Sequence, residues 1–171
     1  ELTVYFSDIR GFTSFAEDMD PEALVELLNE YLSAMTGIVE RHGGYLDKYV
    51  GDAVMAVWGA PVPAPDHALR ACAAALEMRD AVEAMRPSWK ARFGAEIHAG
   101  AGVNTGPMVA GNVGSRQKTS YTVLGDAVNL ASRLEGATKQ YGVSILIGEG
   151  TFAAAREGIA ARRLDVLQVK G

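Results

Sequence analysis

The sequence is poor in the residues that mark several protein classes. It holds one cysteine, Cys72, in 171 residues, so an intrachain disulfide framework is excluded. Its longest charge-free apolar stretch, residues 53–64, is interrupted by glycine and proline and is too short to cross a membrane. Acidic residues outnumber basic ones by 21 to 16, which argues against the broad basic surface of a nucleic-acid binder. A small basic pocket for a triphosphate is still compatible with this charge.

The composition and the length of the chain indicate one globular domain. Hydrophobic residues make up 49% of the chain, too many for a disordered protein, and 171 residues are enough for one sizeable core. No repeat or low-complexity tract divides the sequence, so we assign residues 1–171 to a single domain without membrane contact. Predicted strands lie at both ends, which indicates a domain within a longer protein. The low cysteine content favours a reducing, cytoplasmic location.

Hydrophobic periodicity alternates between strand and helix along the chain. Residues 21–41 repeat apolar side chains at helical spacing behind Asp20, a good N-cap, and Pro21, a favoured first helical residue. Short runs rich in β-forming residues and bounded by turn residues indicate strands. The predicted strands are 2–7, 45–49, 53–58, 97–103, 108–113, 119–124, 143–147 and 163–169, and the predicted helices are 21–41, 66–85, 125–134 and a short one near Thr151.

This order predicts an α/β (α+β) domain with a ferredoxin-like βαββαβ core and additional C-terminal strands and helices. In such a sheet the first strand lies beside the third. Asp8 stands at the end of the first strand and Asp52 in the hairpin turn before the third, so their carboxylates are expected to converge. Two close carboxylates repel unless a cation lies between them, and Mg²⁺ prefers such oxygen ligands. The alternative is purely structural: Asp8 caps the following helix and Asp52 makes the turn.

Gly11, Phe12 and Thr13 follow Asp8 at a predicted strand-to-helix junction. A glycine at such a junction lets backbone N–H groups approach a phosphate, and a helix N-terminus favours an anion. An ordinary helix start explains the same three residues, so on their own they leave both interpretations open.

Three longer motifs carry a resemblance to a known family. Residues 6–13 (FSDIRGFT), 48–53 (KYVGDA) and 121–133 (YTVLGDAVNLASR) resemble, in order and spacing, the two metal-site motifs and the transition-state segment of class III adenylyl and guanylyl cyclases. The similarity extends over nearly the whole chain. It implies the class III cyclase fold and an enzyme that converts a nucleoside triphosphate to a cyclic nucleotide and pyrophosphate.

The resemblance also implies roles for the matching residues at the metal and base positions. Asp8 and Asp52 match the aspartates that hold two divalent ions, Mg²⁺ or Mn²⁺, with the Ile9 carbonyl as a further ligand. Lys48 matches a base-reading position where lysine donates to N1 of adenine and guanylyl cyclases carry an acid. Thr122 matches the second base-reading position, and threonine in place of aspartate resembles a subclass that includes bicarbonate-stimulated enzymes.

Further residues match positions that contact the ribose and the phosphates. Asn129 and Arg133 are four residues apart on a predicted helix and share one face. In the family the asparagine orients the ribose, and the arginine stabilises phosphate charge in the transition state, a role that suits its planar, always-charged fork. Lys170, in a Val-Lys-Gly context, matches a lysine that reaches the triphosphate.

The resemblance implies a homodimer. In this family each active site combines the metal aspartates of one protomer with the base-reading and transition-state residues of the other. This chain carries both sets, so a symmetric dimer with ATP as substrate and two shared sites is expected. The residue at Thr122 further suggests bicarbonate as a regulator.

Three alternatives compete with an adenylyl cyclase. A diguanylate cyclase shares the βαββαβ core, but its Gly-Gly-Asp/Glu-Glu-Phe signature is absent from this sequence. A guanylyl cyclase is disfavoured by Lys48, whose cation would face the N1–H of guanine. A non-catalytic, cyclase-like regulatory or dimerisation module usually lacks a metal aspartate or the Asn/Arg pair, and this chain has all of them.

Overall fold

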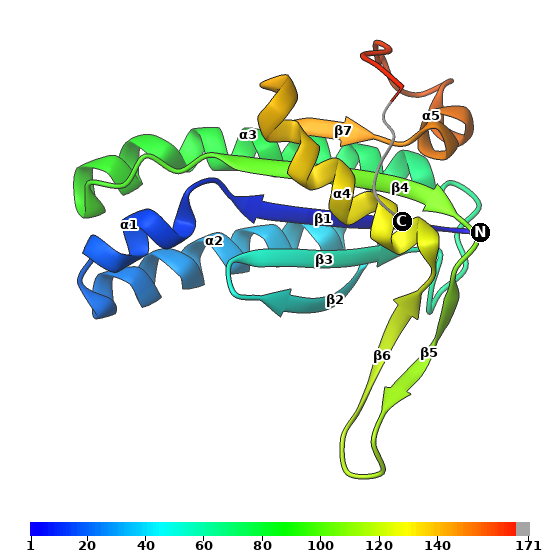
Figure 1. The fold of residues 1–171 in the computed structure, drawn as a ribbon, viewed down its shortest axis with the longest axis horizontal. Coiled ribbons are helices and arrows are strands. Elements are labelled where there is room, and N and C mark those ends of the chain that lie inside the picture. The colour runs from blue at the N-terminus through cyan, green and yellow to red at the C-terminus, as the bar shows by residue number, and fades with distance from the viewer. Residues whose placement is uncertain (167–171) are drawn as a thin grey trace.

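The computed structural model describes residues 1–166, and its central feature is a five-stranded sheet flanked by helices (Figure 1). The elements are β1 (Leu2–Ile9), α1 (Phe12–Asp18), α2 (Pro21–Arg41), β2 (Tyr45–Val50), β3 (Ala53–Trp58), α3 (His67–Phe93), β4 (Ala99–Gly106), β5 (Val109–Gly114), β6 (Thr119–Leu124), α4 (Asp126–Tyr141), β7 (Ile145–Ile147) and α5 (Glu149–Ala155). No helix among residues 1–166 is both long enough and apolar enough to cross a membrane.

The strand order of the main sheet is β2-β3-β1-β4-β7. β1 runs antiparallel to both β3 and β4, and β4 runs parallel to β7. The first four strands, with α2 and α3 as their crossovers, are the predicted ferredoxin-like βαββαβ core, which the structure confirms. β1 is therefore a central strand, and its C-terminal end lies beside the β2–β3 turn.

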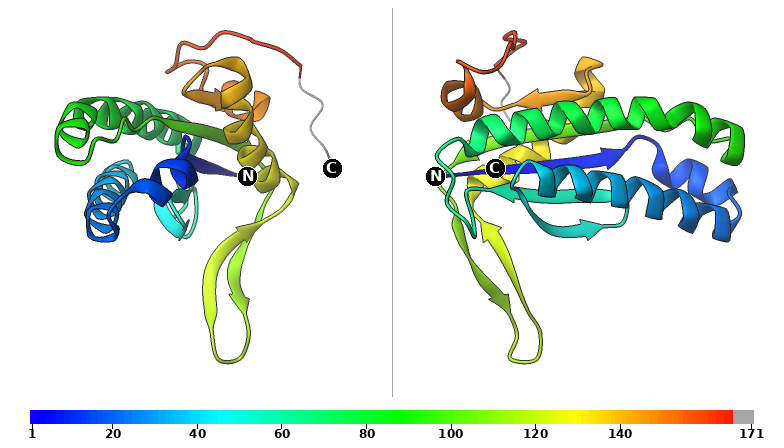
Figure 2. Two further views of the ribbon diagram at one scale, coloured as in Figure 1. Left: turned by 60° about the vertical axis from the view of Figure 1, so that its left-hand side comes forward. Right: turned by 180° about the vertical axis from the view of Figure 1, so that it is seen from behind.

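Both faces of this sheet are covered, because β1 presents apolar side chains alternately to each side. Tyr5 and Ile9 pack into the larger core with α2 and α3, while Val4 packs into a smaller core with Val123 and Ala131. Figure 2 shows α2 and α3 together on one side of the sheet and α4 on the other. This sandwich holds the ends of β1 and β3 rigid at the place where Asp8 and Asp52 lie.

β5 and β6 form a separate two-stranded sheet. The hairpin projects away from the five-stranded sheet in every view (Figures 1 and 2). Its apolar residues Val109, Val113 and Leu124 are exposed by 73%, 43% and 52%. The hairpin contributes Val123 to the smaller core, while these three residues present an apolar surface to its surroundings.

Two long elements differ from the sequence prediction because tertiary packing overrides local signals. α3 continues past Pro87 to Phe93, since Trp89 is fully buried and its indole donates to Glu30. β4 continues to Gly106, through an Asn-Thr-Gly sequence predicted as a turn, because Asn104 is buried and its side-chain amide donates to the Ala127 carbonyl at 2.9 Å.

The other differences concern element ends and one helix. β4 begins at residue 99 rather than 97, β7 at 145 rather than 143, and α4 continues to 141 rather than 134. The short helix α1 begins at the predicted strand-to-helix junction after Gly11, although no bounds were predicted for it. The predicted last strand at 163–169 is wrong for residues 163–166, which form no strand, and its remainder lies outside the described residues.

Glycines in β4 let α4 lie directly on the sheet. A Cβ at Gly102 would come within 2.2 Å of the Ala131 carbonyl oxygen and 2.3 Å of the Glu135 nitrogen, both backbone atoms of α4. A Cβ at Gly100 would come within 2.4 Å of the Thr138 hydroxyl. Since backbone atoms cannot move aside as a flexible side chain can, these positions set how closely α4 approaches the sheet.

We expect Gly102→Ala to push α4 off the sheet. The substitution should lower the free energy of unfolding by about 3 kcal/mol, the upper part of the usual range for overpacking. The matched control is Gly136→Ala on α4 itself, where a Cβ meets nothing within 4 Å. It should raise stability by about 0.5–1 kcal/mol through helix propensity. Equal effects of the two variants in denaturant titrations would contradict this account of the α4 position.

Candidate active site

The structure brings Asp8 and Asp52 together at the end of β1. Asp8 is the penultimate residue of that strand, and Asp52 lies in the two-residue turn between β2 and β3, where Gly51 adopts a φ of +65°. Asp52 is only 9% exposed, and its Oδ2 accepts a hydrogen bond of 2.9 Å from the Ile9 backbone N–H. The predicted convergence of the two carboxylates is therefore found in the fold.

The purely structural alternative for these aspartates does not match the geometry. The N-cap of α1 is Gly11, and no side chain caps this helix, so Asp8 is not its cap. Asp52 does more than occupy a turn, because its side chain reaches across to β1. Their carboxyl groups lie together at the end of β1, and neither helix capping nor turn formation accounts for that closeness.

The electrostatics of this pair require a positive partner. Burial, together with the neighbouring Asp8 carboxyl, raises the pKa of Asp52 from 3.8 to about 7. Asp52 thus keeps its proton up to about pH 7 in the absence of a cation, and its ionisation beside Asp8 costs free energy. A divalent cation fits this donor set, because it replaces this proton and takes oxygen ligands.

Glu135 adds a third carboxylate nearby, which the sequence interpretation missed. Its Oε1 would lie 3.2 Å from a Cβ at Gly100, and Gly100 pairs with Asp8 in the sheet. Burial and then the Asp8 charge raise the pKa of Glu135. Within residues 1–166 no three His, Cys, Asp or Glu side chains are close enough to hold one ion, so Glu135 adds negative field rather than a ligand.

The last three residues of the first motif, Gly11, Phe12 and Thr13, differ in their environments. Gly11 is exposed at the start of α1 with a φ of +69°, and Thr13 is exposed beside it. Phe12 is half-buried and packs edge-on against Phe15, with ring centroids 5.3 Å apart. Phe12 therefore anchors α1 to the core, while Gly11 and Thr13 leave backbone and hydroxyl groups open at the end of β1 near Asp8.

Lys48 and Thr122, 74 residues apart in sequence, come into contact in the fold. Lys48 Nζ on β2 donates to Thr122 Oγ1 on β6 at 3.1 Å. The same cluster includes Asp47, which accepts a hydrogen bond from the Thr122 hydroxyl and lies 3.1 Å from Lys48 Nζ. The edge-on rings of Tyr45 and Tyr121 pack beside it and hold β6 against β2.

Asp47 is the second residue that the sequence interpretation missed. It is a charged residue in a predicted strand, and no motif position distinguished it from a solvated surface side chain. The structure shows that its side chain is fully buried. A carboxylate buried between a lysine and a hydroxyl can be found only when the partner strand is known.

Asn129 and Arg133 occupy one face of α4, as their spacing predicted. Asn129 is exposed and Arg133 is partly exposed, and neither side chain forms a hydrogen bond or ion pair with another residue in the 1–166 range. Nothing links them to the carboxylate pair of the same chain. Lys170, the remaining candidate, lies outside the described residues.

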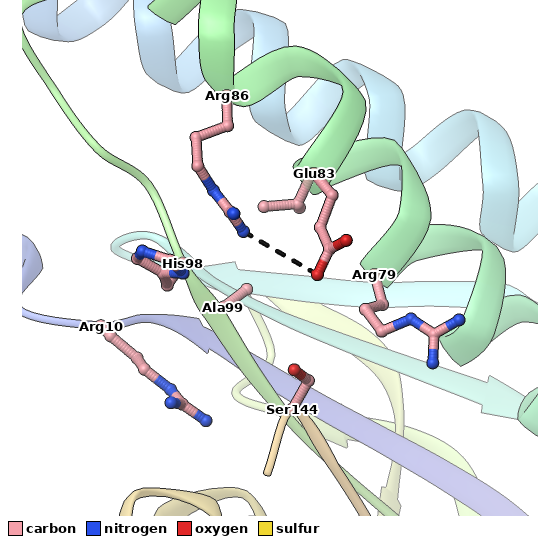
Figure 3. A pocket seen from close by; sticks show the side chains of 8 residues that line it. Arg10, Arg79, Glu83, Arg86, His98, Ala99 and Ser144 are labelled. Carbon is pink, nitrogen blue, oxygen red and sulfur yellow. Dashed lines mark ion pairs between the residues drawn. The ribbon is translucent and has the colours of Figure 1, made fainter. Parts of the chain in front are cut away.

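Arg10 belongs to the first motif but points into a different pocket. Its Nη2 donates to the Val143 carbonyl in the loop after α4. Figure 3 shows its guanidinium directed towards Ser144, in a pocket of about 150 Å³ that Arg86 and Glu83 also line. Arg10 therefore ties the end of β1 to the α4–β7 loop and contributes no group to the paired aspartates.

Comparison with known proteins identifies the family and the fold of this chain. Residues 1–171 match the family described as adenylate and guanylate cyclase catalytic domain. The chain belongs to this family. The predicted class III cyclase fold is confirmed by solved structures of other cyclase domains, with TM-scores of 0.87 and 0.91 in the two cases below.

The similar proteins include cyclases of both base specificities. The chain is 37% identical over its full length to adenylate cyclase 1 of Rhizobium meliloti and 38% identical over 99% of its length to adenylate cyclase of Anabaena cylindrica. It spans 26% and 34% of these relatives. Among solved structures, the adenylyl cyclase CyaB from P. aeruginosa is 40% identical (94% of this chain, 83% of that one), and the guanylyl cyclase Cya2 is 36% identical (99% and 85%).

The cyclase domain should bind Mg²⁺ more tightly as pH rises through about 7. The folded-state pKa of Asp52 lies above its ordinary value, so this group stabilises the metal-free fold below pH 4 and that stabilisation is lost as pH rises through about 7. The cation competes with the same proton, so its apparent affinity should fall about tenfold per pH unit below 7. Thermal melts with and without Mg²⁺ between pH 5.5 and 8.5 measure both effects.

Asp52→Asn provides the control for this titration. The amide removes the ionisation, so metal-free stability at pH 8 should rise and the Mg²⁺-dependent shift in Tm should vanish. A metal response of equal size at pH 6 and pH 8 in the unsubstituted domain would contradict the assignment of Asp52.

Proposed function

We propose that this domain converts ATP to 3′,5′-cyclic AMP and pyrophosphate in intracellular signalling. The observation that carries the proposal is the Asp8–Asp52 pair at the end of the central strand, in which Asp52 is buried and its pKa is raised by that burial and by Asp8. Two divalent ions, Mg²⁺ or Mn²⁺, would be held there by both carboxylates and the Ile9 carbonyl. They supply activation of the ribose hydroxyl and neutralisation of phosphate charge.

The reaction itself is an in-line displacement within one molecule. The 3′-hydroxyl of the ribose attacks the α-phosphorus, the bond to the bridging oxygen breaks, and pyrophosphate leaves. Asn129 orients the ribose, and Arg133 donates to the phosphates as charge builds up in the transition state. Gly11 and Thr13 offer backbone and hydroxyl donors to the triphosphate, with Phe12 fixing their helix, and Lys170 is a further candidate phosphate ligand.

ATP is preferred to GTP in this proposal because of the Lys48–Thr122 contact. The Lys48 side chain is 42% exposed, and its ammonium group has N–H groups beyond the one that it donates to Thr122. Adenine N1 accepts a hydrogen bond, whereas guanine N1 carries a hydrogen that a cation repels. The similarity to adenylate cyclases supports this choice, and the guanylyl cyclases among the similar structures make it a question for experiment.

The positions of the candidate residues support a homodimer with shared sites. Asn129 and Arg133 have no partner among residues 1–166 of their own chain, so they are available to a second copy. The projecting β5–β6 hairpin exposes Val109 and Leu124, which favours burial against that copy (Figure 1). Regulation of the dimer by bicarbonate, suggested by the residue at Thr122, stays a prediction.

The first test is product formation as a function of protein concentration. The purified domain is incubated with ATP or GTP and Mn²⁺ or Mg²⁺, with and without bicarbonate, and the products are separated by chromatography. We expect cyclic AMP and pyrophosphate, with activity per chain rising as dimers form. Constant activity per chain well below dimer dissociation would rule out shared sites. Folded, dimeric protein without any cyclic product would favour a non-catalytic module.

Lys48→Glu tests the base preference. A carboxylate at this position cannot donate to adenine N1 but accepts from guanine N1–H, so ATP turnover should fall at least tenfold relative to GTP turnover. The change is read from kcat/KM for both nucleotides. An unaltered ratio would show that Lys48 does not face the base.

A further inference from the structure

Asp47 is buried in an unusual way for a charged strand residue. Its side chain has no exposed surface, whereas that of its neighbour Lys48 is 42% exposed. Adjacent residues in a regular strand point to opposite faces, yet both of these side chains reach Thr122. The pairing of β2 with β3 shifts register between Leu46 and Lys48, so the strand bulges at Asp47. Such bulges re-aim a side chain.

Because of the bulge, Asp47 is the hydrogen-bond partner that fixes the orientation of the Thr122 hydroxyl. A hydroxyl has one hydrogen to donate and two lone pairs that accept. The Thr122 hydroxyl donates its hydrogen to Asp47 Oδ2 and accepts from Lys48 Nζ. Because the Asp47 carboxylate can only accept, this orientation cannot reverse. One acceptor lone pair is left at Thr122 Oγ1.

The carboxylate also constrains Lys48. Its Oδ1 lies 3.1 Å from Lys48 Nζ, close enough for an ion pair although the angle falls short of a hydrogen bond. Together with the contact to Thr122, this places the ammonium group beside the hydroxyl. Thr122 and Lys48 then present one acceptor, Thr122 Oγ1, next to one donor, Lys48 Nζ.

We propose that Asp47 is the positioning residue that sets base selectivity: by accepting the hydrogen bond of the Thr122 hydroxyl, it leaves this oxygen only as an acceptor beside the Lys48 donor. The inference rests on the proposed nucleotide site. Adenine presents the complementary edge, since its 6-amino group donates and its N1 accepts. Guanine presents the reverse, with an accepting 6-oxygen and a donating N1–H. Threonine alone discriminates weakly because it can donate or accept, and Asp47 removes that freedom.

The experiment measures binding without turnover. 3′-Deoxy-ATP and 3′-deoxy-GTP lack the attacking hydroxyl, so their dissociation constants can be measured by calorimetry with Mg²⁺ at a concentration where the protein is dimeric. We expect Asp47→Ala to lower the preference for the adenine analogue about tenfold, because the Thr122 hydroxyl becomes free to donate to guanine. Asp47→Asn should lower it too, because an amide can donate to Thr122 Oγ1 as well as accept from it, so the hydroxyl orientation is no longer fixed. Asp80→Asn, the same substitution at an exposed ion pair on α3, should leave the preference unchanged.

A double-mutant cycle separates positioning from general stability. In a Thr122→Val background the hydroxyl is gone, so adding Asp47→Asn should cause no further loss of preference. Thr122→Ser keeps the hydroxyl and should retain the preference. Thermal melts identify loss of folding, and Asp47→Ala serves where Asp47→Asn does not fold.

The outcomes of the two proposals are distinguishable. An unchanged preference in both Asp47 variants, or an equal loss in the Thr122→Val background, would overturn the role of Asp47 even if the domain makes cyclic AMP. Selective binding that depends on Asp47, in a protein that forms no cyclic product, would support the inference and reject the cyclase activity. Failure of the unsubstituted domain to bind either analogue would overturn both.

Discussion

The contact between the Asp52 carboxylate and the end of β1 is the interaction on which the candidate site depends. It joins a hairpin turn to the central strand through one hydrogen bond from the Ile9 N–H. Because β1 lies between β3 and β4, this strand end cannot move without disturbing pairings on both sides. The fold thereby holds two carboxyl groups close together, and the proposed metal site follows from the relief that a cation would give to their repulsion.

The placement of α4 is the second constraint. It depends on β4, the strand that pairs with β1 on the side away from β3. Gly100 and Gly102 remove the side chains that would separate α4 from β4, so the helix backbone rests on the strand. This close approach brings Glu135 beside Asp8 and leaves Asn129 and Arg133 facing outward. In the proposed dimer, one face of this helix would lie beside its own carboxylate pair, and another would present Asn129 and Arg133 to a second copy.

Much of this architecture could be predicted from local patterns. The βαββαβ order, the hairpin tip at Asp52 and the shared face of Asn129 and Arg133 follow from periodicity and turn residues, which act over a few positions. The errors have a common cause. Pro87 and the Asn-Thr-Gly run in β4 are strong local breakers, and each was overridden by burial of a neighbouring side chain, Trp89 in one case and Asn104 in the other.

The residue types at the candidate site and the order of the elements that carry them could be read from contiguous motifs. Which side chains meet depends on the folded chain. Asp47 lies beside Lys48 in every conformation of the chain, but a β-bulge and a strand 75 residues away turn it into the buried acceptor for Thr122. Contacts between distant strands depend on register and packing, and no local pattern encodes those.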